Sequence, residues 1–281
     1  MNSLLALDPI FIKIGPLEIR WYAICILAGA LLAYYLSRQL FKKNGYSADV
    51  LDNMFLICFP MGIVGARIWF VLSNLGLYAD NFWGAFKIWD GGMAIQGGVV
   101  LGALSGIFYL HHWHKEIPLM HAFDLIIPNV LVAQSIGRWG NFFNQEVYGA
   151  YVPRESLSFL PKFILDQMDV PGAPAGMVAQ PLFLYECLLT LLSFLIISVI
   201  LRKYWKSRKV GVLGSLYFIF YGVIRASLEL LRNPEYIMEM FGLPTSVVTS
   251  IVYICFGVGL LIYIYFFRDK VLAKKKESEA K

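Results

Sequence analysis

The chain has 281 residues, of which 58% are hydrophobic and only 15% are charged, and its mean hydropathy is +0.63. About a quarter of the residues of a soluble domain are charged, so this composition excludes an ordinary soluble protein and indicates a polytopic membrane protein. The net charge of +5 does not by itself indicate a nucleic-acid partner, because the distribution of the basic residues along the chain is more informative than their total.

The N-terminus, residues 1–15, lacks a basic start and a small-residue cleavage site, so we expect it to be retained as an interfacial lead-in. A membrane span needs about 20 mostly apolar residues. Seven segments meet this requirement: roughly 20–38, 50–72, 92–112, 121–145, 181–201, 211–231 and 246–267. The proline-rich segment from about 150 to 180 is predicted to be an irregular cap outside the membrane.

Lysine and arginine gather in the loops after spans one, three and five and in the C-terminal tail. Basic loops face the cytoplasm, so we expect the N-terminus outside and the C-terminus inside. The sequence therefore predicts an all-α integral membrane protein. Residues 1–267 form one seven-helix domain with an extracytoplasmic insert, and residues 268–281 form a basic cytoplasmic tail that faces anionic lipid.

Polar and ionisable side chains recur at the predicted outer ends of six spans. They include Arg67, Gln96, Glu186 and the stretch GRWGNFFNQEVYG, residues 137–149, which contains Arg138. In span six, Tyr221, Arg225 and Glu229 follow at i, i+4 and i+8, on one helical face. A structural ion pair between Arg225 and Glu229 is one interpretation. Because ionisable groups inside a membrane are costly and usually face a cavity, the whole set favours a functional site.

Arginine suits a phosphate ligand, since its planar fork of donors keeps its charge on burial. Several arginines at this level indicate a phospholipid headgroup, whose glycerol and ester oxygens Asn141, Asn144 and Gln145 are suited to orient. The four histidines all lie within residues 111–121, on the predicted inner side, so none is left as a base at the outer site. The remaining candidate bases are Glu146, Glu186, Glu229, a tyrosine and the lipid phosphate. We expect no metal and no cofactor.

The stretch of residues 137–149 resembles throughout the signature of bacterial prolipoprotein diacylglyceryl transferases, Gly-Arg-x-Gly-Asn-Phe-x-Asn-x-Glu-x-x-Gly. The resemblance extends over residues 9–267, through IRWY, GARI, WDGGMAIQGG, QPLFLYE and YGVIRASLELLR. It implies an enzyme of the bacterial cytoplasmic membrane with its active site toward the outer leaflet. Such an enzyme moves the diacylglyceryl group of phosphatidylglycerol onto the lipobox cysteine of a prolipoprotein and releases glycerol phosphate, without a cofactor or nucleic acid.

Carried over position by position, the resemblance implies that Arg138 binds the headgroup. Arg225 acts at the reacting phosphate or activates the thiol, and Glu229 holds the orientation of Arg225. The implied catalytic residues are Arg138, Arg225 and Glu229, and the implied substrate-binding residues are Tyr22, Gln96, Arg138, Asn141, Glu146, Gly149 and Tyr221.

Two positions depart from the family pattern, since Gln96 and Gln180 stand where many members carry histidine. Glutamine orients a ligand by hydrogen bonds but takes no proton at neutral pH. Either the protein is inactive or the reaction needs no histidine base, and the intact remainder of the signature favours the second hypothesis. The alternatives from other classes are a transporter or flippase of an anionic lipid, which usually shows repeats and a midplane site, and a purely structural membrane protein.

Overall fold

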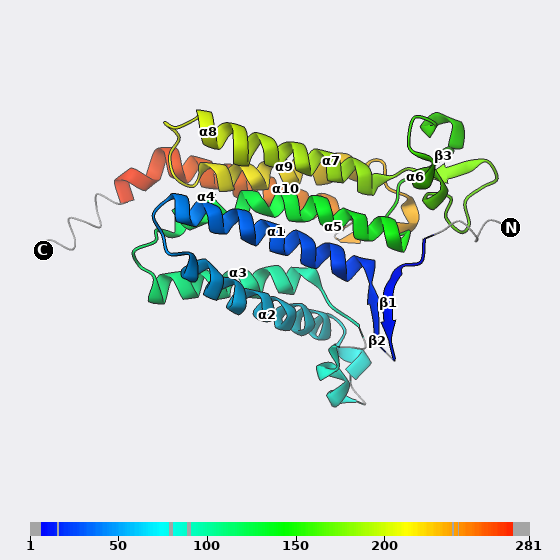
Figure 1. Ribbon diagram of the computed structural model, residues 1–281, viewed down its shortest axis with the longest axis horizontal. Helices are drawn as coiled ribbons and strands as arrows, with labels where there is room; N and C mark the ends of the chain where they lie inside the picture. Colours follow the sequence, from blue (N-terminus) through cyan, green and yellow to red (C-terminus); the bar gives the residue numbers. More distant parts are fainter. Residues whose placement is uncertain are drawn as a thin grey trace, which may run out of the picture. The chain divides into compact units, whose positions relative to one another are not determined.

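The computed structural model describes residues 7–15, 17–78, 81–88, 91–237, 239–240 and 242–271 (Figure 1). Within these residues, six helical segments are long and apolar enough to cross a membrane: Trp21–Lys43, Ala48–Ser73, Leu119–Asn144, Leu182–Tyr204, Val212–Glu229 and Thr245–Val271. Each overlaps a predicted span, as expected of a multi-pass membrane protein. A helix, Ile95–Trp113, also forms over most of the predicted span 92–112, but it is not among these six segments, so the seventh span stays a prediction.

The chain forms two compact units, residues 1–35 with 123–281 and residues 36–122. The prediction of one membrane domain therefore stays a prediction, and most of the basic tail, residues 272–281, lies outside the described residues. The first unit contains most of helix α1 (Trp21–Lys43), then α5 (Val130–Asn144), α7 (Leu182–Phe194), α8 (Arg202–Tyr204), α9 (Val212–Glu229) and α10 (Thr245–Ile262). Helix α4 (Leu119–Ile126) leads into α5 through a 3₁₀ turn (Ile127–Asn129) that contains Pro128, because proline cannot continue the helical hydrogen bonding.

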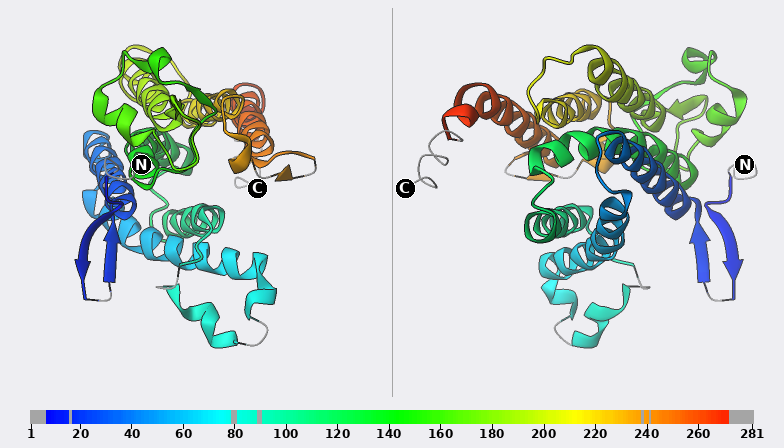
Figure 2. Two further views of the ribbon diagram at one scale, coloured as in Figure 1. Left: turned by 90° about the vertical axis from the view of Figure 1, so that its right-hand side faces the viewer. Right: turned by 60° about the vertical axis from the view of Figure 1, so that its left-hand side comes forward.

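In the first unit, α7 packs against both α5 and α9, and α10 packs against α9 (Figures 1 and 2). A core of Leu131, Ile197, Leu213 and Tyr217 joins α5 and α9 to the π-helical continuation of α7 (Leu195–Leu201). A second π-helical turn (Tyr263–Phe267) continues α10. The carboxylate of buried Asp124 accepts hydrogen bonds from the N–H groups of Gly211 and Gly214 at 2.7 and 2.8 Å. It thereby caps the N-terminus of α9, where unpaired N–H groups and the helix dipole favour a negative charge.

The predicted irregular cap is a small folded element with its own core. It consists of β3 (Tyr151–Pro153), a 3₁₀ turn (Arg154–Leu157), α6 (Lys162–Gln167) and β4 (Met177–Ala179), with β3 and β4 paired antiparallel. Buried side chains of the cap, such as Leu157, Ile164 and Met168, pack against Phe142 of α5 and Phe183 of α7. The cap is therefore attached to the end of α5 that carries the signature stretch.

Two short β-hairpins form in segments for which the sequence predicts no strands. The expected N-terminal lead-in is a hairpin of β1 (Ile10–Ile14) and β2 (Leu17–Arg20), in which alternating residues face opposite sides. After α9 come a 3₁₀ turn (Pro234–Tyr236) and the hairpin of β5 (Glu239–Met240) and β6 (Leu243–Pro244).

The second unit is built on α2 (Ala48–Ser73) and α3 (Ile95–Trp113), which pack against each other. Two 3₁₀ turns, Leu75–Tyr78 and Phe82–Phe86, lie between them. A Cβ on Gly98 would lie 3.0 Å from the carbonyl oxygen of Gly62, and one on Gly102 would lie 3.3 Å from that of Cys58. The glycines of α3 therefore let α2 approach closely, since small residues at an interface allow the backbones of membrane helices to come together.

Two glycines of the signature stretch differ sharply in what surrounds them. A Cβ on Gly140 would lie 2.6 Å from Tyr22 Cδ2 and 3.1 Å from Tyr22 Cα, so α1 packs directly against this glycine. A Cβ on Gly137 would meet nothing within 4 Å. We expect Gly140→Ala to lower the free energy of unfolding by about 1–3 kcal/mol through overpacking. Gly137→Ala should raise it by up to about 1 kcal/mol, because alanine favours the helix.

Denaturant or thermal unfolding of the two variants in detergent measures this difference. Equal stability of Gly140→Ala and Gly137→Ala would contradict the packing of α1 on Gly140.

Candidate active site

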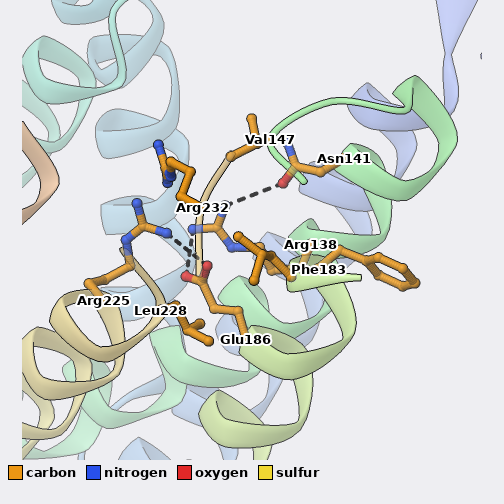
Figure 3. A pocket seen from close by; sticks show the side chains of 9 residues that line it. Arg138, Asn141, Val147, Phe183, Glu186, Arg225, Leu228 and Arg232 are labelled. Atoms are coloured by element: carbon orange, nitrogen blue, oxygen red, sulfur yellow. Dashed lines mark hydrogen bonds and ion pairs between the residues drawn. The ribbon is translucent and has the colours of Figure 1, made fainter. Parts of the chain in front are cut away.

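Glu186 of α7 lies between two arginines from two other helices (Figure 3). Its Oε1 lies 2.6 Å from Arg138 Nη2 of α5, and its Oε2 accepts a hydrogen bond of 2.8 Å from Arg225 Nη1 of α9. The Glu186 side chain is 4% exposed, whereas the two arginine side chains are 21% and 18% exposed. One buried carboxylate therefore fixes two guanidinium groups, and this group of three carries one net positive charge.

A chain of hydrogen bonds continues from Arg138 along the signature stretch. Arg138 donates to Asn141 Oδ1 at 3.3 Å, and Asn141 Nδ2 donates to Glu146 Oε1 at 3.1 Å. Asn144 Nδ2 donates to the same oxygen at 3.3 Å. On the other side, Arg138 Nη2 donates to the hydroxyl of Tyr221 at 3.4 Å. The structure thus brings together Arg138, Asn141, Glu146, Tyr221 and Arg225, as the sequence predicts.

The partner of Arg225 differs from the sequence-based expectation. Glu229 does not supply the carboxylate bonded to Arg225; it pairs with Arg232, whose Nε lies 3.0 Å from Glu229 Oε2. The carboxylate that orients Arg225 is Glu186. Arg225 and Glu229 are four residues apart on α9, which made an ion pair between them plausible. In the structure, however, α7 brings the buried carboxylate of Glu186 to Arg225. Burial, followed by the nearby charge of Arg225, lowers the pKa of the Arg232 guanidinium.

These charged groups surround a small pocket. Its lining comes from α5, α7, α9, the signature loop after α5 and the segment after α9: Arg138, Asn141, Val147, Leu182, Phe183, Glu186, Arg225, Leu228 and Arg232 (Figure 3). Three arginines therefore reach one pocket with apolar walls. Guanidinium groups held in place in this way bind phosphate through charge-assisted, often bidentate hydrogen bonds. Within the described part of the chain, no cluster of three His, Cys, Asp or Glu side chains could hold a metal ion.

Tyr22 and Gly149 contribute to this region through packing. Tyr22, 37% exposed, lies at the first turn of α1 against Gly140, within electrostatic range of Glu146 and Arg138. Gly149 forms a β-bridge with Arg232, and a Cβ there would lie 2.7 Å from the carbonyl oxygen of Leu231. Only glycine fits this approach of two backbone segments, which explains why the stretch ends in glycine.

The loop between α5 and Gly149 has unusual backbone geometry. Gln145 and Val147 have φ angles of +49° and +56°, in the left-handed region. This conformation is a true outlier for a β-branched residue, and residues held in such regions cost about 1–3 kcal/mol each. Val147 also lines the pocket. Strain of this kind clusters at functional sites, where the surrounding structure holds the backbone in place.

Buried Gln167 of the cap holds this loop, and no motif in the sequence marks its role. Its Nε2 donates to the carbonyl of Phe142 at 3.0 Å, at the end of α5, and its own carbonyl accepts from Gln145 Nε2 at 2.7 Å. Its Oε1 accepts from the N–H of Leu7. One cap residue therefore connects the N-terminal segment, the end of α5 and the strained loop.

Arg67, which the sequence groups with the other intramembrane arginines, has a different environment in the second unit. It is 7% exposed and donates to four backbone carbonyls, those of Gly84, Ala85, Gly91 and Gly92, at 2.5–2.9 Å. All its donated hydrogen bonds go to the connection between α2 and α3. Arg67 is a structural arginine that closes this connection.

The two glutamines at the family's histidine positions have different settings. Gln96 lies exposed in the first turn of α3, in the second unit. Gln180 uses its backbone: its carbonyl accepts from the N–H of Gly149 at 2.9 Å, and its N–H donates to Ala150 at 3.1 Å. The sequence predicts Glu186 only as one of several candidate bases, and neither it nor Arg232 is among the implied catalytic and substrate-binding residues. The signal for Glu186 was a single carboxylate inside the apolar run QPLFLYE.

Comparison with known proteins identifies the relatives of this chain. A family model described as prolipoprotein diacylglyceryl transferase matches residues 9–263. A protein of Streptococcus pneumoniae strain Taiwan19F-14, named phosphatidylglycerol–prolipoprotein diacylglyceryl transferase, is 44% identical over 265 residues, which cover 94% of this chain and 96% of the relative. A protein of the same name from a serotype 4 strain is 43% identical over the same coverage.

Glu186, whose carboxylate contacts both arginines, is expected to contribute to the free energy of unfolding. Glu186→Leu leaves two partly buried guanidinium groups facing each other without their carboxylate, so we expect a loss of about 3–5 kcal/mol in the free energy of unfolding. Glu155 of the cap is exposed, and Glu155→Gln should stay within about 0.5 kcal/mol of the parent. Denaturant unfolding in detergent compares the variants. A Glu186→Leu protein as stable as Glu155→Gln would show that the arginines do not depend on Glu186.

Proposed function

The chain belongs to the prolipoprotein diacylglyceryl transferase family, and from this premise we propose how its site works. The enzyme transfers the sn-1,2-diacylglyceryl group of phosphatidylglycerol to the thiol of a prolipoprotein lipobox cysteine. The product is a thioether, and glycerol phosphate is released, in the first step of lipoprotein maturation. The observation that carries the assignment of the site is Glu186, which aims two arginines from the signature stretch and α9 at one pocket.

The proposed topology places the pocket near the outer leaflet. Seven spans, with α3 as the third, put the N-terminus outside and the basic C-terminus in the cytoplasm. The cap at the end of α5 then lies outside the membrane. The basic run of residues 202–209 follows α7 at its other end, on the cytoplasmic side.

In the proposed complex, the phosphodiester of phosphatidylglycerol binds between Arg138 and Arg225. Its single negative charge balances the one net positive charge of the two arginines and Glu186. The neutral amide of Asn141, already bonded to Arg138, is placed to orient the headgroup hydroxyls. Arg232, held by Glu229, reaches the same pocket and supplies a further donor for the phosphate.

The transfer step forms one bond and breaks one. The cysteine sulfur bonds to carbon 3 of the diacylglyceryl group as the bond from that carbon to the phosphate oxygen breaks, and the electron pair leaves on that oxygen. The diester thus becomes a monoester, and negative charge grows on the phosphate. Positive donors that are already in place stabilise this charge without reorganisation, which is the largest contribution that such a site makes to rate.

The thiol proton needs an acceptor, and the carboxylates of the site differ in their partners. Glu186 lies between two guanidinium groups and Glu229 pairs with Arg232, so each of these carboxylates already holds an arginine in place. Glu146 has a different environment, since its carboxylate accepts hydrogen bonds from the amides of Asn141 and Asn144. We assign the role of proton acceptor to Glu146, one hydrogen-bonded residue away from Arg138.

Purified protein with phosphatidylglycerol and a lipobox peptide tests the proposed activity. We expect the peptide to gain the mass of one diacylglyceryl group, and Arg138→Ala and Arg225→Ala to lower the rate by at least about a hundredfold, as for the loss of a preorganised donor. Gln96→Ala should keep much more activity. Lipid movement across vesicles without any mass gain would instead favour the flippase, and inactivity of Gln96→Ala would assign a catalytic role to Gln96.

Glu146→Gln tests the proton acceptor. The amide keeps an oxygen that can accept from Asn141 but cannot take a proton at neutral pH. We expect kcat to fall by about a hundredfold or more, as for loss of a general base, with little change in KM for phosphatidylglycerol. A kcat within about threefold of the parent would mean that another group, such as the lipid phosphate, takes the proton.

A further inference from the structure

A second polar layer lies one helical turn below the arginine pair, and neither the signature nor the pocket includes it. Gln134 precedes Arg138 by four residues on α5, and Tyr217 precedes Tyr221 by four residues on α9. Gln134 Nε2 donates to the hydroxyl of Tyr217 at 3.0 Å, as Arg138 donates to that of Tyr221. Four residues of helix correspond to about 6 Å, so the new layer lies that far from the arginines, away from the cap.

The protein does not use the full hydrogen-bonding capacity of this layer. Gln134 Oε1 is buried without a hydrogen-bond partner among the described residues. The second N–H of Gln134 and the O–H of Tyr217, which already accepts from Gln134, have no acceptor in the described part of the chain. A buried amide that is half used costs free energy, so its presence in an apolar core calls for an explanation.

The position of the layer relative to the arginines matches the position of the ester groups relative to the phosphate in a phospholipid. In a diacyl phospholipid the two ester groups lie between the phosphate and the acyl chains, and therefore deeper in the bilayer than the phosphate. Ester carbonyls are hydrogen-bond acceptors, so they can accept from the two unused donors of the layer, the second N–H of Gln134 and the O–H of Tyr217, although they do not pair with the acceptor Gln134 Oε1. Tyr217 also stacks on Tyr221, with ring centroids 6.0 Å apart and planes within 10°, so the layer is continuous with the arginine site.

We propose that Gln134 and Tyr217 bind the ester carbonyls of the lipid whose phosphate Arg138 and Arg225 hold. The inference rests on the proposed function, because the phosphate position sets the depth. The layer aligns carbon 3 of the diacylglyceryl group, which lies between the esters and the phosphate, for attack by the thiol. Gln134 and Tyr217 therefore determine specificity for ester-linked over ether-linked lipid.

A comparison of diacyl and dialkyl phosphatidylglycerol of equal chain length tests this proposal. The reaction breaks neither ester, so replacing esters by ethers leaves the reacting bond unchanged. The parent enzyme should use the diester with a kcat/KM about tenfold higher than the diether, roughly the effect of one or two hydrogen bonds. Gln134→Leu should lower kcat/KM for the diester about tenfold and leave the diether within about twofold. In this variant, the ratio of kcat/KM for the diester to kcat/KM for the diether would then approach one.

Two further variants make the outcome decisive. Tyr217→Phe removes only the hydroxyl and should also reduce the ratio. Ser250→Ala deletes a buried hydroxyl of α10 that bonds within its own helix, and should leave the ratio unchanged. A parent enzyme that does not distinguish diester from diether, or a Gln134→Leu that slows both equally, would overturn the proposal. If Arg138→Ala loses activity on both the diester and the diether while Gln134→Leu keeps the parent's diester-to-diether ratio, the phosphate site would be supported and the ester-binding layer rejected.

Discussion

The site depends on one carboxylate, Glu186, shared by two arginines that come from different helices. Two guanidinium groups repel each other, and partly buried guanidinium groups are costly without a counter-ion. Since the Glu186 side chain is almost fully buried in α7, the helix that packs on both α5 and α9, its position is fixed by the core. Glu186 thereby sets the separation of the arginines while leaving one positive charge for the ligand.

The candidate site also depends on the loop of the signature stretch, whose backbone is strained. Val147 keeps a left-handed conformation because contacts at both ends of the loop determine its path: Gln167 binds the end of α5, and Gly149 pairs with the segment at Arg232. The cap therefore acts on the site through backbone geometry. Its folded core, which includes Leu157 and Ile164, explains how a proline-rich segment outside the predicted spans can be rigid enough for this.

The sequence predicted the helices better than it predicted the contacts between them. Helical periodicity placed Tyr221, Arg225 and Glu229 on one face, and the structure agrees that all three lie in α9. Periodicity could not tell that Arg225 turns to Glu186, because that contact depends on how α7 packs against α9. For the same reason Arg67 resembled Arg138 in the sequence, although backbone carbonyls of a neighbouring connection surround it. Helical periodicity shows which residues share a face of one helix, but not which side chain of another helix they contact.

The partners of the carboxylates, rather than a histidine, underlie the proposed proton transfer. Gln180, at one histidine position of the family, makes its contacts with the loop through its backbone, and a different side chain would leave those hydrogen bonds possible. Glu186 lies between two guanidinium groups, so its carboxylate serves to hold them in place. Glu146 accepts hydrogen bonds from the neutral amides of Asn141 and Asn144, so a proton taken up there leaves both arginine contacts of Glu186 intact. In the proposed mechanism, the arginines around one carboxylate and the asparagines around the other therefore separate a positioning role from a proton-accepting one.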